Sequence, residues 1–363
     1  MAMQDIYQSI VKTVQQAGKH HPMIVCGHSF MRHPAYDRLL QASDMETVPF
    51  HDCEPNPKYD SVLKGLKLFE DNHCDMLISV GGGSPMDVGK SIKAFVGMDQ
   101  QTPCVNQAIV PNAIPHLAIP TTAGTGSEAT HFAVIYYEGK KYSVSDMSLT
   151  PDYVVLDAEL LSGLPLYQRK ATMLDALCHA IESYWSVKAT KTSRAFAWLA
   201  ITEFMEAYPA YLANTLSGNA AMLQAANLAG KAINLTTTTA AHAMSYKLTS
   251  LYGIAHGHAV SLCLPRVWKY MLTHMDGVRD SLTTTGVQQS FRELASLIGF
   301  DTPERASDFP IQLTRDLDME VPALRSTDEL NVLATSVNVQ RLSNNPVDLD
   351  ANDLRSIYRT ISA

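Results

Sequence analysis

The stretch Met76–Lys90 (MLISVGGGSPMDVGK) joins a short apolar run to three consecutive glycines and the start of a helical pattern. An apolar run of this length, ended by a turn signal, is typical of a buried strand. Glycines after a strand let a ligand approach the backbone closely, and the N–H groups of a following helix attract phosphate. The loop matches neither G-x-G-x-x-G nor a P-loop, so a tight strand–helix turn stays open as the alternative.

The same alternation of strand and helix extends to both sides of this stretch. A second loop, Pro120–Glu128 (PTTAGTGSE), is rich in hydroxyls and glycine and also follows an apolar run. Alternating strands and helices predict a parallel α/β sheet that binds ligands at the carboxyl ends of its strands. Two loops of this kind fit a dinucleotide better than a mononucleotide. The other expected strands are His21–Cys26, Glu46–Phe50, His116–Ile119, Phe132–Tyr137, Lys141–Val144 and Asp152–Leu156, with helices at Arg38–Leu40 and Tyr59–Asn72.

From Pro165 onward the pattern is helical only, with long amphipathic segments and no strand-like alternation. We therefore predict an α/β domain over residues 1–164 and an all-α domain over residues 165–363. The expected helices are Lys170–Val187, Ser193–Asn214, Asn219–Leu235, Thr238–Leu251, Gly257–Met271, Val287–Ile298 and Ala351–Ser362.

Potential metal ligands lie in the helical half. Asp175 and His179 are four residues apart, so on a helix they project from the same face. His242 and His256 follow, with His258 just beyond. One carboxylate and up to three imidazoles form a sensible ligand set for Fe²⁺ or Zn²⁺. In a chain with 13 histidines, ordinary capped or solvated residues are the alternative interpretation.

Composition excludes several classes of function. The net charge of −8 argues against non-specific binding of nucleic acid. No apolar run approaches the length of a membrane span, and the first residues lack an apolar signal-peptide core. We therefore expect a cytoplasmic protein, with six scattered cysteines in reduced form.

Four stretches together resemble the iron-containing alcohol dehydrogenases, which share their architecture with the dehydroquinate synthases. They occur in the order of that family and cover about residues 20–350. They are Gly81–Asp87 (GGGSPMD), Pro120–Glu128, Asp175-x3-His179 and His242-x13-His256-Gly.

The resemblance implies a dinucleotide-binding domain, a helical domain and a cleft between them, in a homodimer. It implies NADPH or NADH as cofactor and Fe²⁺ as the metal, with Zn²⁺ as the alternative. The metal ligands would be Asp175, His179, His242 and His256. The cofactor contacts would be Asn56, Gly82, Gly83, Ser84, Asp87, Thr121, Thr122, Thr125, Ser127 and Lys141.

Two positions depart from the family pattern. Members that prefer NAD often have an Asp where this chain has Gly27, and a carboxylate there would repel a 2′-phosphate. Its absence permits NADPH, which we favour. Many members have a second His four residues after the third ligand, where this chain has Tyr246. We expect Tyr246 or the nearby His258 to relay a proton, with simple packing as the alternative for Tyr246.

The expected reaction is reduction of an aldehyde to a primary alcohol, with hydride from the nicotinamide and the metal acting as a Lewis acid. Thr238 and Lys247 are the expected substrate contacts, with Arg266 as a further cation nearby. Hydroxyls and cations suit an anionic aldehyde. The run His242–Lys247 (HAMSYK) resembles the phosphonoacetaldehyde reductase branch of the family, which implies phosphonoacetaldehyde as substrate and a place in phosphonate biosynthesis.

Other functions remain open at this point. A general short-chain alcohol dehydrogenase of the butanol, lactaldehyde or propanediol type would share the same site. A non-redox cyclising lyase on the same scaffold would need a Glu in its metal set, which the Asp-His-His-His set disfavours. A metal-free binding protein is disfavoured because all four ligand types are present.

Overall fold

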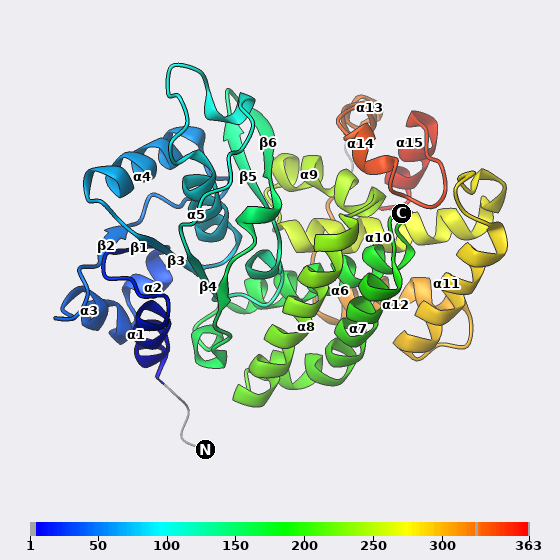
Figure 1. The fold of residues 1–363 in the computed structure, drawn as a ribbon. Helices are drawn as coiled ribbons and strands as arrows, with labels where there is room; N and C mark the ends of the chain where they lie inside the picture. Colours follow the sequence, from blue (N-terminus) through cyan, green and yellow to red (C-terminus); the bar gives the residue numbers. More distant parts are fainter. Residues whose placement is uncertain (1–4, 324–325, 362–363) are drawn as a thin grey trace. The chain divides into compact units, whose positions relative to one another are not determined.

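The structure, a computed structural model, describes residues 5–323 and 326–361. The chain forms two compact units (Figure 1). Unit 1 comprises Met1–Thr122 and Ser127–Gly163, and unit 2 comprises Ala123–Gly126 and Leu164–Ala363. The PTTAGTGSE loop is therefore divided, because its central four residues pack within the second unit.

Unit 1 contains a five-stranded parallel sheet in the order β2-β1-β3-β4-β7, which confirms the predicted parallel α/β sheet. In the register of β3 and β4, Gly81 lies opposite Pro120. The two loops that were singled out in the sequence therefore leave the sheet from neighbouring carboxyl ends. The elements of this unit are α1 (Ile6–Gln16), β1 (Pro22–Cys26), α2 (His28–Met31), α3 (Pro34–Leu40), β2 (Val48–Phe50), α4 (Tyr59–Asp71), β3 (Met76–Gly81), α5 (Gly83–Phe95), β4 (His116–Pro120), β5 (Phe132–Tyr137), β6 (Lys140–Ser145) and β7 (Tyr153–Val154).

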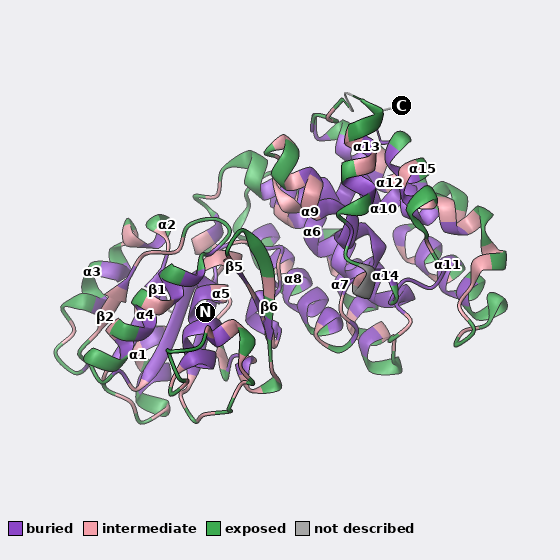
Figure 2. Ribbon diagram, turned by 90° about the horizontal axis from the view of Figure 1, so that it is seen from above, coloured by how far each residue is buried: buried purple, intermediate pink, exposed green. Residues whose placement is uncertain are grey.

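Both faces of the sheet are covered, which explains why its central strands are buried and mostly apolar. Successive residues of β1 point to opposite faces. Met23 and Val25 pack in a cluster with α4 and α5, whereas Ile24 and Cys26 pack in another with α1, α2 and α3. Figure 2 shows β1 in the colour of buried residues, and β3 and β4 are buried throughout as well. Two apolar cores thus hold the sheet rigid.

The predicted β-ribbon is also confirmed. β5 and β6 pair antiparallel and are joined by Glu138 and Gly139, whose φ angles are 49° and 72°. Positive φ at both central residues is the signature of a two-residue hairpin turn that matches the twist of its strands.

Unit 2 is helical, as predicted, apart from an isolated bridge between Val278 and Val347. Its helices are α6 (Leu166–Trp185), α7 (Lys191–Leu212), α8 (Leu216–Thr236), α9 (Ala240–Tyr252), α10 (His256–Thr273), α11 (Thr284–Ile298), α12 (Pro303–Asp316), α13 (Thr327–Thr335), α14 (Val339–Leu342) and α15 (Ala351–Arg359). Within the described residues, no helix is both long and apolar enough to cross a membrane.

Glycines allow the segment Ala123–Gly126 to lie against the helices of unit 2. A Cβ added to Gly126 would come within 2.4 Å of the Gly230 Cα on α8. A Cβ added to Gly124 would come within 2.6 Å of the Thr172 carbonyl oxygen on α6. The glycines of this motif are therefore required by packing, whatever they do for a nucleotide.

Some elements were not predicted. α1 was missed, although its buried residues Ile6, Ile10 and Val14 are spaced four apart. The helices α12, α13 and α14 were missed as well. The last expected helix ends at Arg359, and Ser362 lies outside the described residues.

His116 is a buried histidine at the start of β4 that keeps its neutral form. Its Nε2 lies 2.8 Å from the Ser79 hydroxyl, and both residues are fully buried. Burial, together with the charges of Lys90 and Lys93, lowers the pKa of His116 to about 3. The folded chain therefore resists protonation at a pH where the unfolded chain accepts a proton.

Replacing His116 with Asn should make the stability of the chain less sensitive to acid. The pKa of His116 is lower in the folded chain than in the unfolded chain. Its contribution to the free energy of unfolding is therefore fully present above the unfolded pKa and is lost as the pH falls toward the folded pKa. Between pH 7.5 and pH 5 the wild type should lose about 2 kcal/mol more free energy of unfolding than His116→Asn. Urea unfolding curves at the two pH values measure this, and equal losses would contradict it.

Candidate functional site

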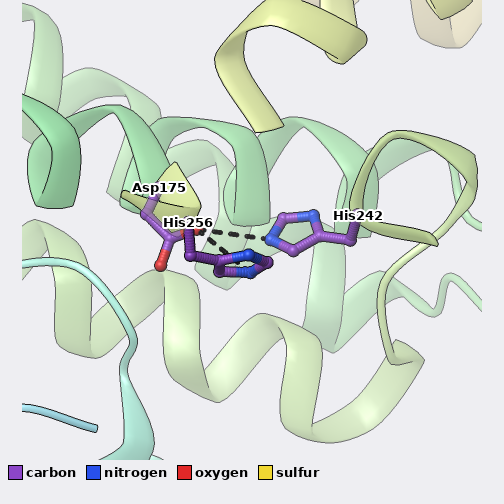
Figure 3. Close-up of side chains that lie close together, drawn as sticks. All are labelled: Asp175, His242 and His256. Carbon is purple, nitrogen blue, oxygen red and sulfur yellow. Dashed lines mark ion pairs between the residues drawn. The ribbon is translucent and has the colours of Figure 1, made fainter. Parts of the chain in front are cut away.

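Three side chains from three helices of unit 2 meet in one cluster (Figure 3). Asp175 lies on α6, His242 lies on α9, and His256 begins α10. Asp175 Oδ1 is 3.4 Å from His242 Nε2 and 3.9 Å from His256 Nε2. One ligand atom of each residue lies within 4.8 Å of the others. A carboxylate oxygen and two imidazole nitrogens at these distances can share one cation.

The buried donor atoms of the cluster fit a metal ion. Asp175 Oδ1 and His242 Nε2 are both buried, and neither has a hydrogen-bond partner among the described residues. A buried polar atom without a partner costs about 1–3 kcal/mol. A cation between the two atoms would satisfy both at once, which is the function that the sequence predicts for them.

His179 lies beside the cluster without belonging to its closest set. Its ring stacks on that of His242, with centroids 4.3 Å apart and an interplanar angle of 17°. Its Nδ1 is buried without a hydrogen-bond partner in the described part of the chain. The set of atoms within 4.8 Å contains only the other three residues. The role of His179 as fourth ligand stays a prediction.

The buried carboxylate of Glu182 fixes the orientation of His242. Its Oε2 pairs with His242 Nδ1, which leaves Nε2 to face Asp175. Its Oε1 accepts hydrogen bonds from the backbone N–H groups of Thr239, at 3.1 Å, and Ala241, at 2.9 Å. It also accepts one from the Thr239 hydroxyl, at 2.6 Å. A carboxylate behind an imidazole is the usual support of a metal-binding histidine, because it sets the tautomer and the ring orientation.

Two buried carboxylates dominate the electrostatics of the cluster. Burial opposes their charged forms, but His179 and His242 lower the pKa of Asp175, and His242 lowers the pKa of Glu182. Burial also opposes the charged form of His242, yet Glu182 and Asp175 on its two sides raise its pKa. Burial lowers the pKa of His179 to about 4. The raised pKa favours a protonated His242 between the two carboxylates, and a divalent cation at Nε2 could replace that proton and balance both charges.

The position of His256 depends on its neighbours. Its Nδ1 lies 3.4 Å from the hydroxyl of Ser245 on α9. A Cβ added to Gly257 would lie 2.0 Å from the Ala171 carbonyl oxygen and 2.7 Å from the Asp175 Cβ. Only glycine therefore lets α10 begin against α6, and this close approach brings His256 to Asp175.

The two predicted proton-relay residues lie in different surroundings. The ring of Tyr246 stacks on His256, with centroids 5.5 Å apart and an interplanar angle of 3°. His258 is buried, and its Nδ1 lies 3.1 Å from the Tyr167 hydroxyl, which accepts a hydrogen bond from the N–H of Ala255. Burial lowers the pKa of His258. Tyr246 thus stacks on the candidate metal ligand His256, whereas His258 lies within hydrogen-bond distance of Tyr167 at the start of α6. A proton-relay role for either residue stays a prediction.

The predicted substrate contacts do not form one group with Arg266. Thr238 Oγ1 accepts a hydrogen bond of 2.6 Å from Arg341 on α14, a residue that sequence reasoning did not identify. Lys247 is five residues after His242, so it projects about 140° away from it around the helix. Arg266 lines a pocket of about 660 Å³ that contains none of the candidate metal ligands.

The predicted phosphate-binding loops meet at the end of the sheet. Gly82 precedes α5 in an extended conformation, and the N–H of Thr121 donates to the Gly81 carbonyl at 2.9 Å. A Cβ added to Gly82 would lie 3.3 Å from the Thr122 Cγ2. The structure thereby brings together the predicted contacts Gly82, Gly83, Ser84, Thr121 and Thr122.

A buried lysine ties α5 to the far end of the PTTAGTGSE loop. Lys90 Nζ donates to the Ser127 carbonyl at 2.5 Å, the Ser127 hydroxyl at 3.1 Å and the Thr130 hydroxyl at 3.0 Å. Burial raises the pKa of Asp87 against the opposing charge of Lys90, and burial lowers the pKa of Lys90. Lys90 was not identified as functional from sequence, although it stands three residues after Asp87 on the same helix.

The remaining predicted cofactor contacts lie near the β-ribbon or in unit 2. Asn56 is exposed, with a φ of 59°. Two residues later, Lys58 forms an isolated β-bridge with Tyr136 of β5. Lys141, on the neighbouring strand β6, pairs with the same Tyr136. Thr125 belongs to unit 2. Their contacts with a nucleotide stay predictions.

Glu182 is the main functional residue that sequence reasoning missed. It comes three residues after His179 and seven after Asp175, so helical periodicity places all three on one face of α6. That spacing is the signal that could have identified it.

Comparisons with known proteins show the family of this chain. The family model described as iron-containing alcohol dehydrogenase matches residues 3–158, and the C-terminal model of the same family matches residues 170–362. The phosphonoacetaldehyde reductase of Streptomyces viridochromogenes is 32% identical over 346 residues, covering 91% of this chain and 87% of that protein. The choline dehydrogenase of Bacillus subtilis is 31% identical over 351 residues, covering 90% of this chain and 83% of that protein.

Solved structures show the same fold over nearly the whole chain. The sulfoacetaldehyde reductase of Bifidobacterium kashiwanohense, determined in complex with NAD+, superposes with a TM-score of 0.87 at 27% identity. The match covers 99% of this chain and 96% of that one. With both halves matched by its family models, this chain belongs to the iron-containing alcohol dehydrogenase family.

Proposed function

We propose that the chain reduces a small aldehyde to a primary alcohol with NADPH or NADH, at Fe²⁺ or Zn²⁺ held by Asp175, His179, His242 and His256. As a member of its family, the chain is an NAD(P)-linked oxidoreductase. The observation that carries the metal assignment is the pair of buried atoms, Asp175 Oδ1 and His242 Nε2, neither of which has a hydrogen-bond partner among the described residues.

The side chains of the site have distinct roles in this proposal. A bound divalent ion supplies a Lewis acid for the carbonyl oxygen, and a bound nicotinamide supplies the hydride. Glu182 keeps His242 Nδ1 occupied so that Nε2 is presented as a ligand atom. Tyr246 is favoured over His258 to pass the proton, because its ring packs on His256 and His258 is bonded to Tyr167.

We favour an anionic aldehyde, phosphonoacetaldehyde, as the substrate. Two relatives are named for two-carbon aldehydes that carry an anionic group, a phosphonate or a sulfonate. A relative at almost equal identity is named for choline, which is a cation. Overall identity therefore does not select the charge of the substrate, and the side chains near the metal must do so.

The alternative is a general short-chain alcohol dehydrogenase that accepts butanal, lactaldehyde or 3-hydroxypropanal. The same metal and nicotinamide chemistry would serve it. Family membership favours either redox reaction over a cyclising lyase. A homodimer, which the family resemblance implies, is also part of the proposal and can be measured by sedimentation.

The proposed reaction is tested with the purified protein loaded with Fe²⁺ or Zn²⁺. Oxidation of NADPH or NADH is followed by absorbance with phosphonoacetaldehyde, butanal, lactaldehyde and betaine aldehyde as substrates. We expect phosphonoacetaldehyde to have the highest kcat/KM, and a chelator to remove turnover. The variant His256→Ala should lose metal-dependent turnover and keep its circular dichroism spectrum.

Three outcomes would contradict this proposal at different levels. Full turnover in His256→Ala or in chelated protein would show that the metal site is wrong. Equal or better kcat/KM with butanal would retain the metal chemistry and reject the anionic substrate. A highest rate with betaine aldehyde would place the chain with the choline-type relatives instead.

Replacing Glu182 with Gln should weaken metal binding. A Gln amide cannot accept the His242 Nδ1 proton and the N–H groups of α9 at the same time, so the imidazole loses its support. Loss of such a support typically costs about 10- to 100-fold in metal affinity. Competition with a chelator measures this affinity. The matched variant Glu293→Gln, which alters the partner of the Tyr184 hydroxyl, should bind metal normally.

Replacing Gly27 with Asp should shift the preference from NADPH toward NADH. Gly27 has φ of −87°, and the nearest atom to an added Cβ is Pro85 Cγ at 3.8 Å, so a side chain fits. A carboxylate there would repel a 2′-phosphate and accept a hydrogen bond from a 2′-OH. The ratio of kcat/KM for NADPH to that for NADH should fall about 10-fold, equivalent to ~1.4 kcal/mol. An unchanged ratio would show that Gly27 does not face the ribose.

A further inference from the structure

Arg341, on the short helix α14, contacts residues next to the candidate metal cluster. Its Nη1 donates a hydrogen bond of 2.6 Å to Thr238 Oγ1, at the loop before α9. Its guanidinium carbon lies 5.7 Å from the centroid of the Tyr246 ring. Tyr246 in turn stacks on His256. One aromatic ring therefore connects this guanidinium to a candidate metal ligand.

In the described part of the chain, no carboxylate forms an ion pair with Arg341. Among the described residues, no Asp or Glu oxygen lies within 4.0 Å of its guanidinium, although the side chain is half-buried. A guanidinium has five N–H donors, and the bond to Thr238 uses one of them. The planar fork of an arginine matches the oxygens of a phosphonate or sulfonate. The unused donors thus suit an oxyanion.

The turn after α14 is fastened to the loop before α9. The buried Asn344 donates from Nδ2 to the carbonyls of Thr236, at 2.7 Å, and Thr238, at 3.1 Å. Its Oδ1 accepts a hydrogen bond of 2.9 Å from the hydroxyl of Ser186 at the end of α6. Arg341 is therefore held close to α9 before any substrate binds, and a preorganised donor loses less entropy on binding.

We propose that Arg341 is the specificity-determining residue that binds the tetrahedral oxyanion of the substrate, with Thr238 holding the guanidinium in place. The inference rests on the proposed function and names the group that selects its substrate class. Phosphonoacetaldehyde and sulfoacetaldehyde carry their oxyanion one carbon from the carbonyl, so the anion must be recognised close to the metal. Lys247 is the rival cation, but it projects from α9 about 100° away from Tyr246.

The test compares four variants of the metal-loaded protein, Arg341→Gln, Arg341→Lys, Lys247→Gln and Arg305→Gln. Arg305 is an exposed arginine that pairs with Asp301, so Arg305→Gln is the matched control. In Arg341→Gln, kcat/KM for phosphonoacetaldehyde and sulfoacetaldehyde should fall roughly 10- to 100-fold, as for loss of a charged hydrogen bond. Turnover of butanal should fall much less, because butanal has no oxyanion for Arg341 to bind. Arg341→Lys keeps the charge and should recover part of the loss.

Binding of ethylphosphonate, an unreactive analogue, gives a readout that is independent of turnover. Calorimetry with the NAD+-bound protein should show the same loss of affinity in Arg341→Gln and none in Arg305→Gln. In Arg341→Gln, the aldehyde whose kcat/KM falls more, phosphonoacetaldehyde or sulfoacetaldehyde, carries the oxyanion that Arg341 binds more strongly.

Three results would overturn the role of Arg341. The first is an unchanged preference for anionic aldehydes in Arg341→Gln, which would leave the proposed function intact. The second is an equal loss for butanal and the anionic aldehydes, which would indicate that Arg341 only supports the loop. The third is a loss of preference in Lys247→Gln without one in Arg341→Gln. A wild-type protein that reduces no aldehyde at all would instead reject the proposed function itself.

Discussion

The organisation of the helical unit depends on one buried carboxylate, that of Glu182. A charge in the protein interior is tolerated only when hydrogen bonds compensate its lost hydration. Glu182 obtains them from two sources, the first turn of α9 and the imidazole of His242. The same bonds that make this charge stable therefore join α6 to α9 and aim His242 at Asp175. The hydrogen bonds that Glu182 needs in the interior thus serve both the packing of α6 against α9 and the orientation of the candidate ligand His242.

The candidate metal centre and the proposed oxyanion site come from different parts of the chain. The candidate ligands lie on α6, α9 and α10, whereas Arg341 lies on α14 and reaches the cluster through Tyr246 and Thr238. This separation suits a family whose members share one reaction and differ in substrate. The relatives at 32% and 31% identity, named for phosphonoacetaldehyde and choline, illustrate how far the charge of the substrate varies. A change on α14 would leave the carboxylate and imidazoles of the metal site untouched.

The sequence predicts those features that depend on local pattern. The strands of the parallel sheet, the loops at Gly81 and Pro120, and the helices after residue 165 follow from apolar runs, glycine and periodicity. Contacts between distant single residues carry no such pattern. Lys90 reaches Ser127 across 37 positions, Glu182 reaches His242 across 60, and Arg341 reaches Thr238 across 103. For this reason the candidate ligands could be listed in advance, whereas the contacts that orient them could not, although helical spacing places Glu182 on the face of α6 that carries Asp175 and His179.

Asn344 has a consequence for how the chain matures during synthesis. It clamps the carbonyl of Thr236, which precedes it by 108 residues. Domains generally fold as units, and the main part of unit 2 runs from Leu164 to the end of the chain. The candidate ligands on α6, α9 and α10 are synthesised before the segment that fastens the neighbouring loop. Asn344 therefore joins the last part of unit 2 to an early one, and the loop before α9 reaches its final position only when both have been made.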